Sequence, residues 1–307
     1  MLTHPLQDLE NWVLFFSGAD LPVLRNTVRQ LDALRADIDR VNGRDISRVV
    51  LHDPLMTVKV LAYIQPFSGK TLRTEITTIG SAVMMIGVEP FFEKFKDLVT
   101  IEQMLKGEPQ SMLGTLQLIR RVQRAAHYAH EWALWRQDLN VEEVTIAALL
   151  HDLAEILLWC FAPKLASEIR ERQKANRTLR SAAVQQDVLG IRLIDLQLAL
   201  CKAWHLPELL ANLIDPAHAE HPRIRNVLLA VDLARHSANG WNDAALPDDF
   251  AAIEALLHLN RDALIDRLKL TDEEKAQLPP MPLMPPPIDP AEPVEPIEPA
   301  EPDQPAV

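Results

Sequence analysis

Ile146-Ala-Ala-Leu-Leu-His-Asp-Leu-Ala-Glu-Ile-Leu-Leu158 is the most apolar run in the chain, and it carries the adjacent residues His151 and Asp152 at its centre. The apolar positions of this run cover a wide arc at 3.6 residues per turn, which predicts a helix buried on most sides. A helix of this kind lies in the core of a domain. We therefore expect the other helices of the chain to pack around it.

The adjacent His151 and Asp152 have two interpretations. As a site, the two side chains could take two positions on one metal ion, because histidine nitrogen and carboxylate oxygen both suit Mn, Fe or Zn. As structure, a buried histidine and aspartate can satisfy each other and the neighbouring backbone by hydrogen bonding. The two residues alone are compatible with both interpretations.

The composition predicts an all-α fold. Hydrophobic residues make up 48% of the 307 positions, which is typical of a folded protein with a sizeable core. The sequence contains nine glycines and few stretches that alternate between apolar and polar residues, so β-sheet is poorly supported. The length is enough for two modest domains or for one large helical domain.

The charge of the chain bears on its partners. The net charge of −12 argues against a general nucleic-acid binder or a membrane-surface binder, because phosphate groups would be repelled on average. Residues 279–307 hold six acidic residues and no basic ones. Removing these six charges leaves −6 for residues 1–278, so the body of the protein is only mildly acidic.

Cysteine usage and hydropathy predict a cytoplasmic protein. Cys160 and Cys201 are far apart in the sequence, lie within predicted helices and form no CxxC motif, which is typical of reduced core residues. The N-terminus lacks a basic segment followed by an apolar core, and no uninterrupted apolar run approaches about 18 residues. We therefore expect neither a signal peptide nor a membrane span.

The sequence divides into three segments. Gly107-Glu-Pro109 combines a glycine and a proline that together end a helix, which indicates a boundary between two lobes. We expect an N-terminal helical lobe over residues 1–110, a second helical lobe over 111–270, and a disordered tail rich in proline and glutamate over 271–307.

The first lobe contains clear helix signals. Asp53 before Pro54 predicts a helix start, with the acid as N-cap and the proline in the first turn. Asp45 is expected to cap a short helix that ends at Leu51, and Gln65-Pro-Phe-Ser-Gly69 is expected to form a loop. Apolar spacing predicts further helices over residues 1–16, 22–36, 76–86 and 89–106.

The second lobe begins with a long helix predicted over residues 112–136. Its polar side carries Arg120, Arg121 and Arg124, which are typical of a solvated face. Alternatively, the basic stretch from Arg120 to Arg136 forms, with Lys164 to Arg180, a patch for a phosphorylated ligand or nucleic acid. A central helix over 141–160 is expected to lie antiparallel to the long helix across a short connection. Further helices are expected within residues 163–186, 189–204, 206–214, 224–237 and 249–269.

The C-terminal tail has a composition of its own. Twelve of the 23 prolines fall in the last 29 residues, and glutamate recurs every third residue from Glu292 to Glu301. Such a segment is predicted to form extended polyproline-like coil rather than a folded domain, with the glutamates along one edge. It is either a solubilising spacer or a ligand for a basic or aromatic groove on another protein.

A family resemblance narrows these expectations. Leu149-Leu-His-Asp-Leu153 resembles the His-Asp signature of the HD superfamily of metal-dependent phosphohydrolases. The surroundings resemble its HDOD branch, whose members are generally regarded as signalling modules without the full metal site. The similarity covers about residues 20–237 and is carried by Leu21-Pro-Val-Leu24, His52-Asp-Pro-Leu-Met-Thr-Val-Lys-Val-Leu61, Glu75-Ile-Thr-Thr-Ile-Gly-Ser-Ala-Val-Met-Met-Ile-Gly87 and Trp204-His-Leu-Pro-Glu208.

The resemblance also identifies which metal ligands the chain retains. HD hydrolases bind metal through a first histidine, the His-Asp pair and a later aspartate, which correspond here to Arg121, to His151 and Asp152, and to Asp232. An arginine in place of the first histidine adds a permanent positive charge that repels a divalent ion, so we expect an Arg121–Asp152 ion pair instead. Glu155 is found where the hydrolases commonly carry a lysine, and its carboxylate would repel a phosphate.

Other histidines are not expected to complete a metal site. His127 and His130 lie six and nine residues after Arg121, about 240° and 180° further around the helix axis, so neither faces in the same direction. His218 and His221 fall in a predicted loop, where a shifted alignment could supply one ligand but not a complete set. The expectation is therefore a protein with no metal and no cofactor.

We expect a non-catalytic bacterial signal-transduction module that acts as a scaffold for a protein partner, with His151 and Asp152 as relics in the core. This role follows from the resemblance and not from the composition. The alternative is a degenerate metal-dependent phosphohydrolase that acts on a nucleotide or cyclic dinucleotide through His151, Asp152 and Asp232. A small-molecule nucleotide ligand and the arginine patch described above remain open as binding functions.

Overall fold

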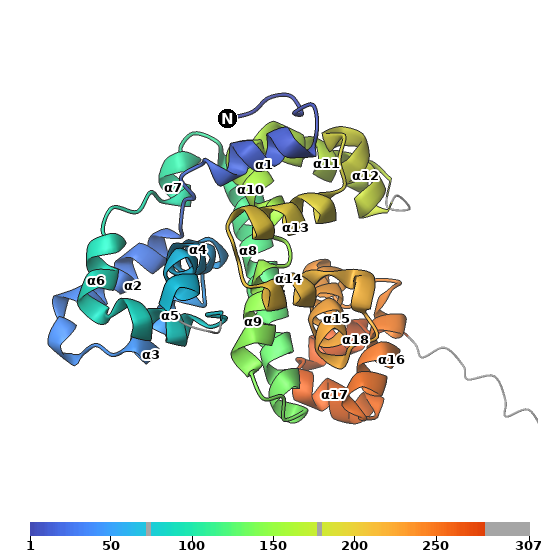
Figure 1. The fold of residues 1–307 in the computed structure, drawn as a ribbon. Coiled ribbons are helices and arrows are strands. Elements are labelled where there is room, and N and C mark those ends of the chain that lie inside the picture. Colours follow the sequence, from blue (N-terminus) through green and yellow to red (C-terminus); the bar gives the residue numbers. More distant parts are fainter. Residues whose placement is uncertain (72–74, 177–179, 280–307) are drawn as a thin grey trace, which may run out of the picture.

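The computed structural model describes residues 1–71, 75–176 and 180–279, with side chains outside 67–71 (Figure 1). Within these ranges the secondary structure is helical apart from turns and one isolated β-bridge between Val23 and Thr100. The all-α prediction is therefore confirmed. Residues 280–307, which include most of the predicted tail, lie outside the described part of the chain.

The first lobe is built from short helices around one long one, α4. Its core is formed by side chains such as Val50, Leu55, Leu61 and Phe91, all fully buried. The elements are α2 (Arg25–Ala36), η1 (Ile38–Arg40), α3 (Gly43–Val50), α4 (Pro54–Thr71), α5 (Ile79–Ile86), α6 (Val88–Lys94) and α7 (Ile101–Met104).

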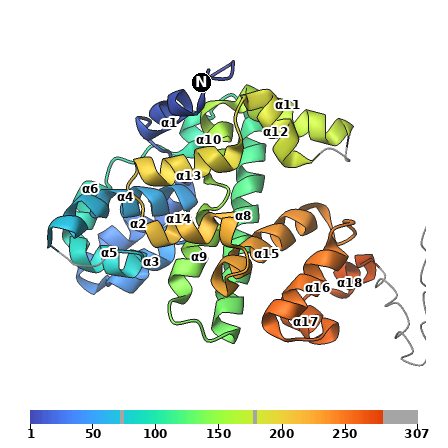
Figure 2. The same cartoon turned by 45° about the vertical axis from the view of Figure 1, so that its right-hand side comes forward.

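The second lobe is organised on a helical hairpin, α8 and α9, against which α15 packs (Figures 1 and 2). The side chains from Ile146 to Leu150 are fully buried, as the apolar pattern of residues 146–158 predicted. The elements are α8 (Pro109–Trp135), α9 (Val141–Leu150), α10 (Leu153–Phe161), α11 (Pro163–Ala175), α12 (Ser181–Leu189), α13 (Leu193–Ala203), α14 (Glu208–Ile214), η2 (Pro216–His218), α15 (Pro222–His236), η3 (Ser237–Asn239), α16 (Leu246–Leu257), α17 (Arg261–Leu268) and α18 (Asp272–Gln277).

The single central helix predicted over 141–160 is wrong, because the chain breaks between α9 and α10 at His151 and Asp152. The buried side chain of Gln197, from α13, satisfies both sides of this break. Its Nε2 donates to the carbonyl of Leu150 at 3.0 Å, and its Oε1 accepts from the backbone N–H of Ala154 at 2.8 Å. A break inside a core is stable only when its backbone groups have such partners.

Several predicted boundaries in the first lobe also differ. The loop predicted at 65–69 is part of α4, which continues through Pro66 even though a proline inside a helix removes one hydrogen bond. Asp45 is not the cap of α3: Asn42 caps it, and Asp45 completes a capping box as the third residue. The helix predicted over 89–106 is interrupted, and only its two ends form α6 and α7.

The N-terminal segment packs on the second lobe. In both views α1 (Leu9–Ser17) lies beside α13 (Figures 1 and 2). The Leu2 N–H donates to the carbonyl of Phe161 at 2.7 Å, and the rings of Phe15 and Phe16 pack edge-on against the Phe161 ring. The first seventeen residues therefore form part of the second lobe in space, although the sequence analysis placed them in the first.

The start of the predicted tail is folded. Residues 271–279, assigned to the tail from the sequence, contain α18, whose N-terminus carries a capping box formed by Thr271 and Glu274. Trp241 fixes this helix to the lobe: its N–H donates to Gln277 at 3.0 Å, and its indole Nε1–H donates to Glu274 at 3.2 Å. The physical reason is local, because good capping residues start a helix without a long apolar run.

One segment has the length and apolar composition of a membrane span, whereas the sequence analysis expected none. It is Val141–Phe161, the α9–α10 pair. Of the most apolar 18-residue window in this segment, 78% is buried inside the protein, which is the pattern of core helices. The polar His151 and Asp152 interrupt its apolar run, which is why the sequence analysis found no continuous span.

Candidate functional site

The candidate site forms where three helices meet at the α9–α10 break. α8 supplies Arg121, the break itself supplies His151 and Asp152, and α10 supplies Glu155 one turn later. α15 packs against α8 and α9 and brings Asp232 and Arg235 to the same region. The residues that the resemblance identified therefore gather in one region, although they come from α8, α10, α15 and the break between α9 and α10.

The carboxylate of Asp152 is surrounded by positive and polar groups. Arg121 donates from one guanidinium nitrogen to Asp152 Oδ2 at 2.6 Å and to Glu155 Oε2 at 2.8 Å. The other oxygen of Asp152, Oδ1, lies 2.9 Å from His151 Nδ1 and 3.6 Å from a guanidinium nitrogen of Arg235. The expected Arg121–Asp152 ion pair is present, and both carboxylate oxygens have partners.

The electrostatics of this cluster follow from its burial. Burial alone would raise the pKa of Asp152, whose side chain is 9% exposed, but the charge of Arg121, the hydrogen bond with His151 and the charge of Arg235 outweigh it. The pKa of Asp152 is held well below its usual range. Burial alone would lower the pKa of Arg121, but Glu155 and Asp152 raise it instead. Both groups remain charged, as in a stable buried ion pair.

Asp232, the expected last metal ligand, does not join Asp152 directly. Its partner is Arg235, one turn later on α15, at 3.4 Å. Arg235 thus lies between the carboxylates of Asp232 and Asp152 and contacts both. Burial and the charge of Asp249 raise the pKa of Asp232, whereas Arg235 opposes this rise.

The donor set does not fit the metal site of an HD hydrolase. Two arginines, Arg121 and Arg235, occupy the space around the carboxylates that a divalent cation would need, and a guanidinium cannot act as a ligand. Among the residues that the structure describes, no group of three His, Cys, Asp or Glu side chains is arranged to hold a metal ion. This arrangement favours a fixed ion-pair network in place of a metal centre.

The three arginines of α8 have different surroundings. Arg120 is exposed, Arg121 is neutralised by the two carboxylates, and Arg124 donates to the carbonyl of Ala234 at 2.9 Å near the end of α15. Two of the three arginines therefore stabilise contacts between helices. His127 is exposed, and His130 lies 3.1 Å from the hydroxyl of Thr145 on α9, so neither joins the site.

Two residues of the site were missed by the sequence analysis, Arg235 and Gln197. Arg235 follows Asp232 by three residues, which is a detectable i,i+3 pair, but its second partner Asp152 is 83 positions away in the sequence. In the sequence Gln197 is an ordinary polar residue of a predicted helix. The residues next to it do not indicate that its side chain binds the backbone of a helix break elsewhere. A pattern of local spacing cannot find either contact.

The helical hairpin of α8 and α9, with α15 packed against it, defines an all-α helical protein. The match to the HDOD domain family covers residues 21–220, about two thirds of the sequence. The chain therefore belongs to the HDOD domain family, as the resemblance predicted. No curated protein matches the chain.

Solved structures share this fold. The MmoQ response regulator from Methylococcus capsulatus str. Bath superimposes with a TM-score of 0.62 at 17% identity, over 83% of this chain and 100% of that chain. A virulence factor from Campylobacter jejuni subsp. jejuni superimposes with a TM-score of 0.59 at 20% identity, over 88% of this chain and 97% of that chain. At these identities the likeness shows the fold alone.

Proposed function

We propose that this protein is a non-catalytic signal-transduction module that acts as a scaffold for a protein partner. The observation that carries the proposal is the position of Arg121, which pairs with Asp152 and Glu155 where the first metal ligand of an HD hydrolase would be. A phosphohydrolase of this type needs a metal ion to activate water and to neutralise the phosphate. An arginine paired with two carboxylates does neither.

The surroundings of the pair support the same proposal. Glu155 adds a negative charge where an incoming phosphate would need a positive one, and Arg121 is neutralised before any ligand arrives. The HDOD fold itself occurs in a protein described as a response regulator, which is compatible with a signalling role here. In this proposal His151 and Asp152 stabilise the junction of α9 and α10.

The contact between the lobes gives the scaffold a defined shape. Glu142, in the first turn of α9, accepts from the backbone N–H groups of Ile79 and Gly80 at 2.7 and 3.3 Å, at the start of α5. The next residue, Glu143, accepts from the hydroxyl of Thr77 and from Arg223, each at 2.7 Å. The helix that leads to the His-Asp junction is therefore tied to the first lobe.

We further propose that the module acts in the cytoplasm, without a cofactor and without a membrane or general nucleic-acid partner. Its two cysteines, Cys160 and Cys201, are unpaired and buried, as in proteins from reducing compartments. The acidic net charge of −12 disfavours phosphate-rich surfaces. The partner that fits these properties is another protein of a signalling pathway.

A hydrolysis assay tests the proposal. The full chain is incubated with nucleotides and cyclic dinucleotides in the presence of Mn²⁺, Fe²⁺ or Mg²⁺, next to a His151→Ala/Asp152→Asn variant. We expect both proteins to give the same background rate, since His151 and Asp152 do not bind the added metal ion in this proposal. Turnover by the wild-type chain that the double substitution abolishes would support the phosphohydrolase alternative and contradict the proposal.

A further inference from the structure

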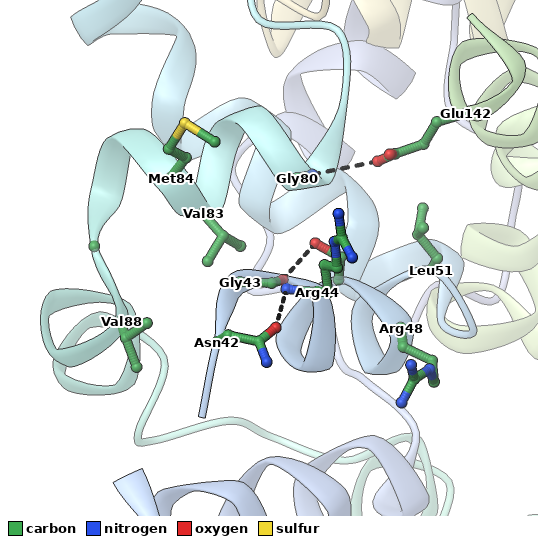
Figure 3. A pocket seen from close by; sticks show the side chains of 12 residues that line it. Asn42, Gly43, Arg44, Arg48, Leu51, Gly80, Val83, Met84, Val88 and Glu142 are labelled. Atoms are coloured by element: carbon green, nitrogen blue, oxygen red, sulfur yellow. Dashed lines mark hydrogen bonds between the residues drawn. The ribbon is translucent and has the colours of Figure 1, made fainter. Parts of the chain in front are cut away.

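The first lobe has an open groove with an apolar floor. It lies between α3 and α5, reaches the start of α6, and has a volume of about 860 Å³ (Figure 3). Its apolar lining includes Leu51, Val83, Met84 and Val88. Met84 is 83% exposed, although it is a large apolar side chain of a short helix in a folded lobe. An exposed apolar surface of this kind marks a contact site.

The rim of the groove along α3 is basic. Arg44 and Arg48 lie one helical turn apart, both are exposed, and both line the groove (Figure 3). Arg48 is only loosely paired with Asp45, at 3.8 Å. At the far end Glu142 lines the groove too, but its carboxylate is held by the N-terminus of α5. The groove therefore suits a ligand that is apolar on one side and negative on the other.

The C-terminal segment of the chain has this chemistry. Residues 291–302 read Ala-Glu-Pro-Val-Glu-Pro-Ile-Glu-Pro-Ala-Glu-Pro, a repeat of three residues. In the polyproline II conformation predicted for this segment, with three residues per turn, the aliphatic residues line one edge, the glutamates a second and the prolines a third. An aliphatic edge next to a glutamate edge matches an apolar floor next to an arginine rim.

We propose that residues 291–302 of one chain bind in the α3–α5 groove of a second copy of the protein. The aliphatic edge, with Val294 and Ile297, would contact the apolar floor, and the glutamate edge would face Arg44 and Arg48. An extended segment held in the polyproline conformation loses little entropy on binding, which suits recognition by a shallow groove. Reciprocal exchange of the two segments gives a closed twofold dimer.

The reach of the chain favours a second copy over the same copy. α18, where the described part of the chain ends, lies on the opposite side of α8 and α9 from α3 and α5 in both views (Figures 1 and 2). The intervening residues 280–290 span about 40 Å at most when fully extended. A compact body of 279 residues has a diameter of about 48 Å, and the chain would have to pass around its surface. The groove of a neighbouring copy has no such restriction.

The experiment uses the full chain and two complementary variants. The tail variant carries Glu292→Gln, Glu295→Gln, Glu298→Gln and Glu301→Gln, and it keeps the groove intact. The groove variant carries Arg44→Glu and Arg48→Glu, and it keeps the tail intact. Arg29→Glu/Arg120→Glu, two exposed arginines away from the groove, is the control with the same change of charge. Sedimentation velocity over a range of concentrations gives the state of association of each.

The expected result is that the wild-type chain and the control dimerise with rising concentration, that each variant alone remains monomeric, and that a mixture of the two variants forms a dimer. The mixture should dimerise because the tail variant supplies an intact groove and the groove variant supplies an intact tail. Added salt should weaken the dimer, since the contact is partly ionic. A wild-type chain that stays monomeric, or variants that each dimerise as the wild type does, would overturn the proposal.

A labelled peptide with the sequence of residues 288–303 identifies the surface. Fluorescence anisotropy should show it binding to the tail variant, and the same tail variant with Arg44→Glu and Arg48→Glu added should bind it about tenfold more weakly, as expected for two exposed charge contacts. Equal binding to both proteins would place the peptide elsewhere and would overturn the groove assignment. The result does not depend on whether the second lobe is catalytic.

Discussion

Asp53 in the first lobe and Asp152 in the second are both buried carboxylates at the start of a helix, yet their partners differ in kind. Asp53 is fully buried and accepts four hydrogen bonds from neutral donors: the N–H groups of Leu24, Leu55 and Met56 and the hydroxyl of Thr27, at 2.7 to 3.1 Å. Asp152 is held by two arginines and a histidine.

The difference separates a carboxylate that neutral donors hold from one that charged side chains hold. Asp53 joins the chain before α2 to the start of α4, and burial raises its pKa, although its hydrogen bonds from neutral donors oppose the rise. Asp152 keeps a pKa well below the usual range because Arg121, the hydrogen bond with His151 and Arg235 stabilise its charged form. The first carboxylate is a helix cap held by neutral donors, and the second is a member of an ion-pair network.

The largest effect is expected for Asp53→Ala. The change removes four hydrogen bonds, uncaps α4 and leaves buried N–H groups without partners, so the free energy of unfolding should fall by about 3 to 4 kcal/mol. Denaturant unfolding followed by circular dichroism measures this. Asp39→Ala, at an exposed aspartate, is the control and should change stability little. A loss as small as that of the control would show that Asp53 is not the main cap.

A slightly smaller loss is expected for Arg121→Met. Removal of the arginine leaves Asp152 and Glu155 buried or partly buried without their main cation, which should lower the free energy of unfolding by about 2 to 3 kcal/mol, since Arg235 compensates in part. The triple variant Arg121→Met/Asp152→Asn/Glu155→Gln should recover part of this loss. If neutral carboxylate replacements bring no recovery, the charge balance is not what the arginine provides.

The two aspartates should respond to pH in opposite directions. The folded pKa of Asp152 lies below the unfolded value of about 3.9, so its stabilising effect is present above pH 4 and disappears as the pH falls through the folded pKa. The stability advantage of the wild type over Asp152→Asn, about 2 kcal/mol at pH 7 by analogy with other charged hydrogen bonds, should therefore shrink in acid.

For Asp53 the sign is reversed. Its folded pKa lies above the unfolded value, so the folded state binds more protons between the two, and stability from this group falls as the pH rises through that interval. The advantage of the wild type over Asp53→Asn should decrease from pH 4 upward. Unfolding curves at several pH values measure both differences, and parallel pH profiles for the two variants would remove the distinction drawn between the aspartates.

A third buried carboxylate, Asp249, pairs with a histidine, and the loss of this pair is expected to change stability least. His236 Nδ1 lies 2.5 Å from its Oδ2 and joins α15 to α16. This hydrogen bond raises the pKa of His236 against partial burial, with help from the charges of Asp249, Asp232 and Asp243. The stabilisation of the folded state by the His236–Asp249 pair is therefore complete below about pH 6.5, and it is lost as the pH rises through the folded pKa of His236.

The measurement for this pair is the stability of the wild type relative to His236→Gln between pH 6 and pH 9. The wild type should be more stable by about 1 kcal/mol at pH 6, and the difference should fade toward pH 9. His127→Gln, at an exposed histidine of α8, is the control and should show no such trend. A difference that stays constant with pH would show that folding leaves the pKa of His236 unchanged, and it would contradict this prediction.

The same residues show how far the sequence could predict this molecule. The Asp53-Pro54 signal gave the start of α4 correctly, because a cap acts within three residues of itself. The Arg121–Asp152 pair was expected only because a family resemblance aligned two positions 31 residues apart. Contacts of this kind have no local signature.

The break at His151 could not be predicted, because Leu150 and Leu153 on its two sides are equally buried and the apolar pattern continues across it. The break is stabilised by a hydrogen bond from Gln197, which lies 47 positions from Leu150. The packing of α1 on the second lobe could not be predicted either, because it also depends on a distant partner. Its apolar face was visible in the sequence, but the partner of that face, Phe161, is set by the tertiary fold.

The central claim, that arginines have replaced the metal in the second lobe, is tested most directly by the metal content of the protein. The full chain is purified anaerobically without chelator or histidine tag and measured by elemental analysis. We expect Fe, Mn and Zn well below one ion per chain, because Arg121 and Arg235 occupy the space beside Asp152. A content near one ion per chain would contradict it and would show that other ligands complete the site.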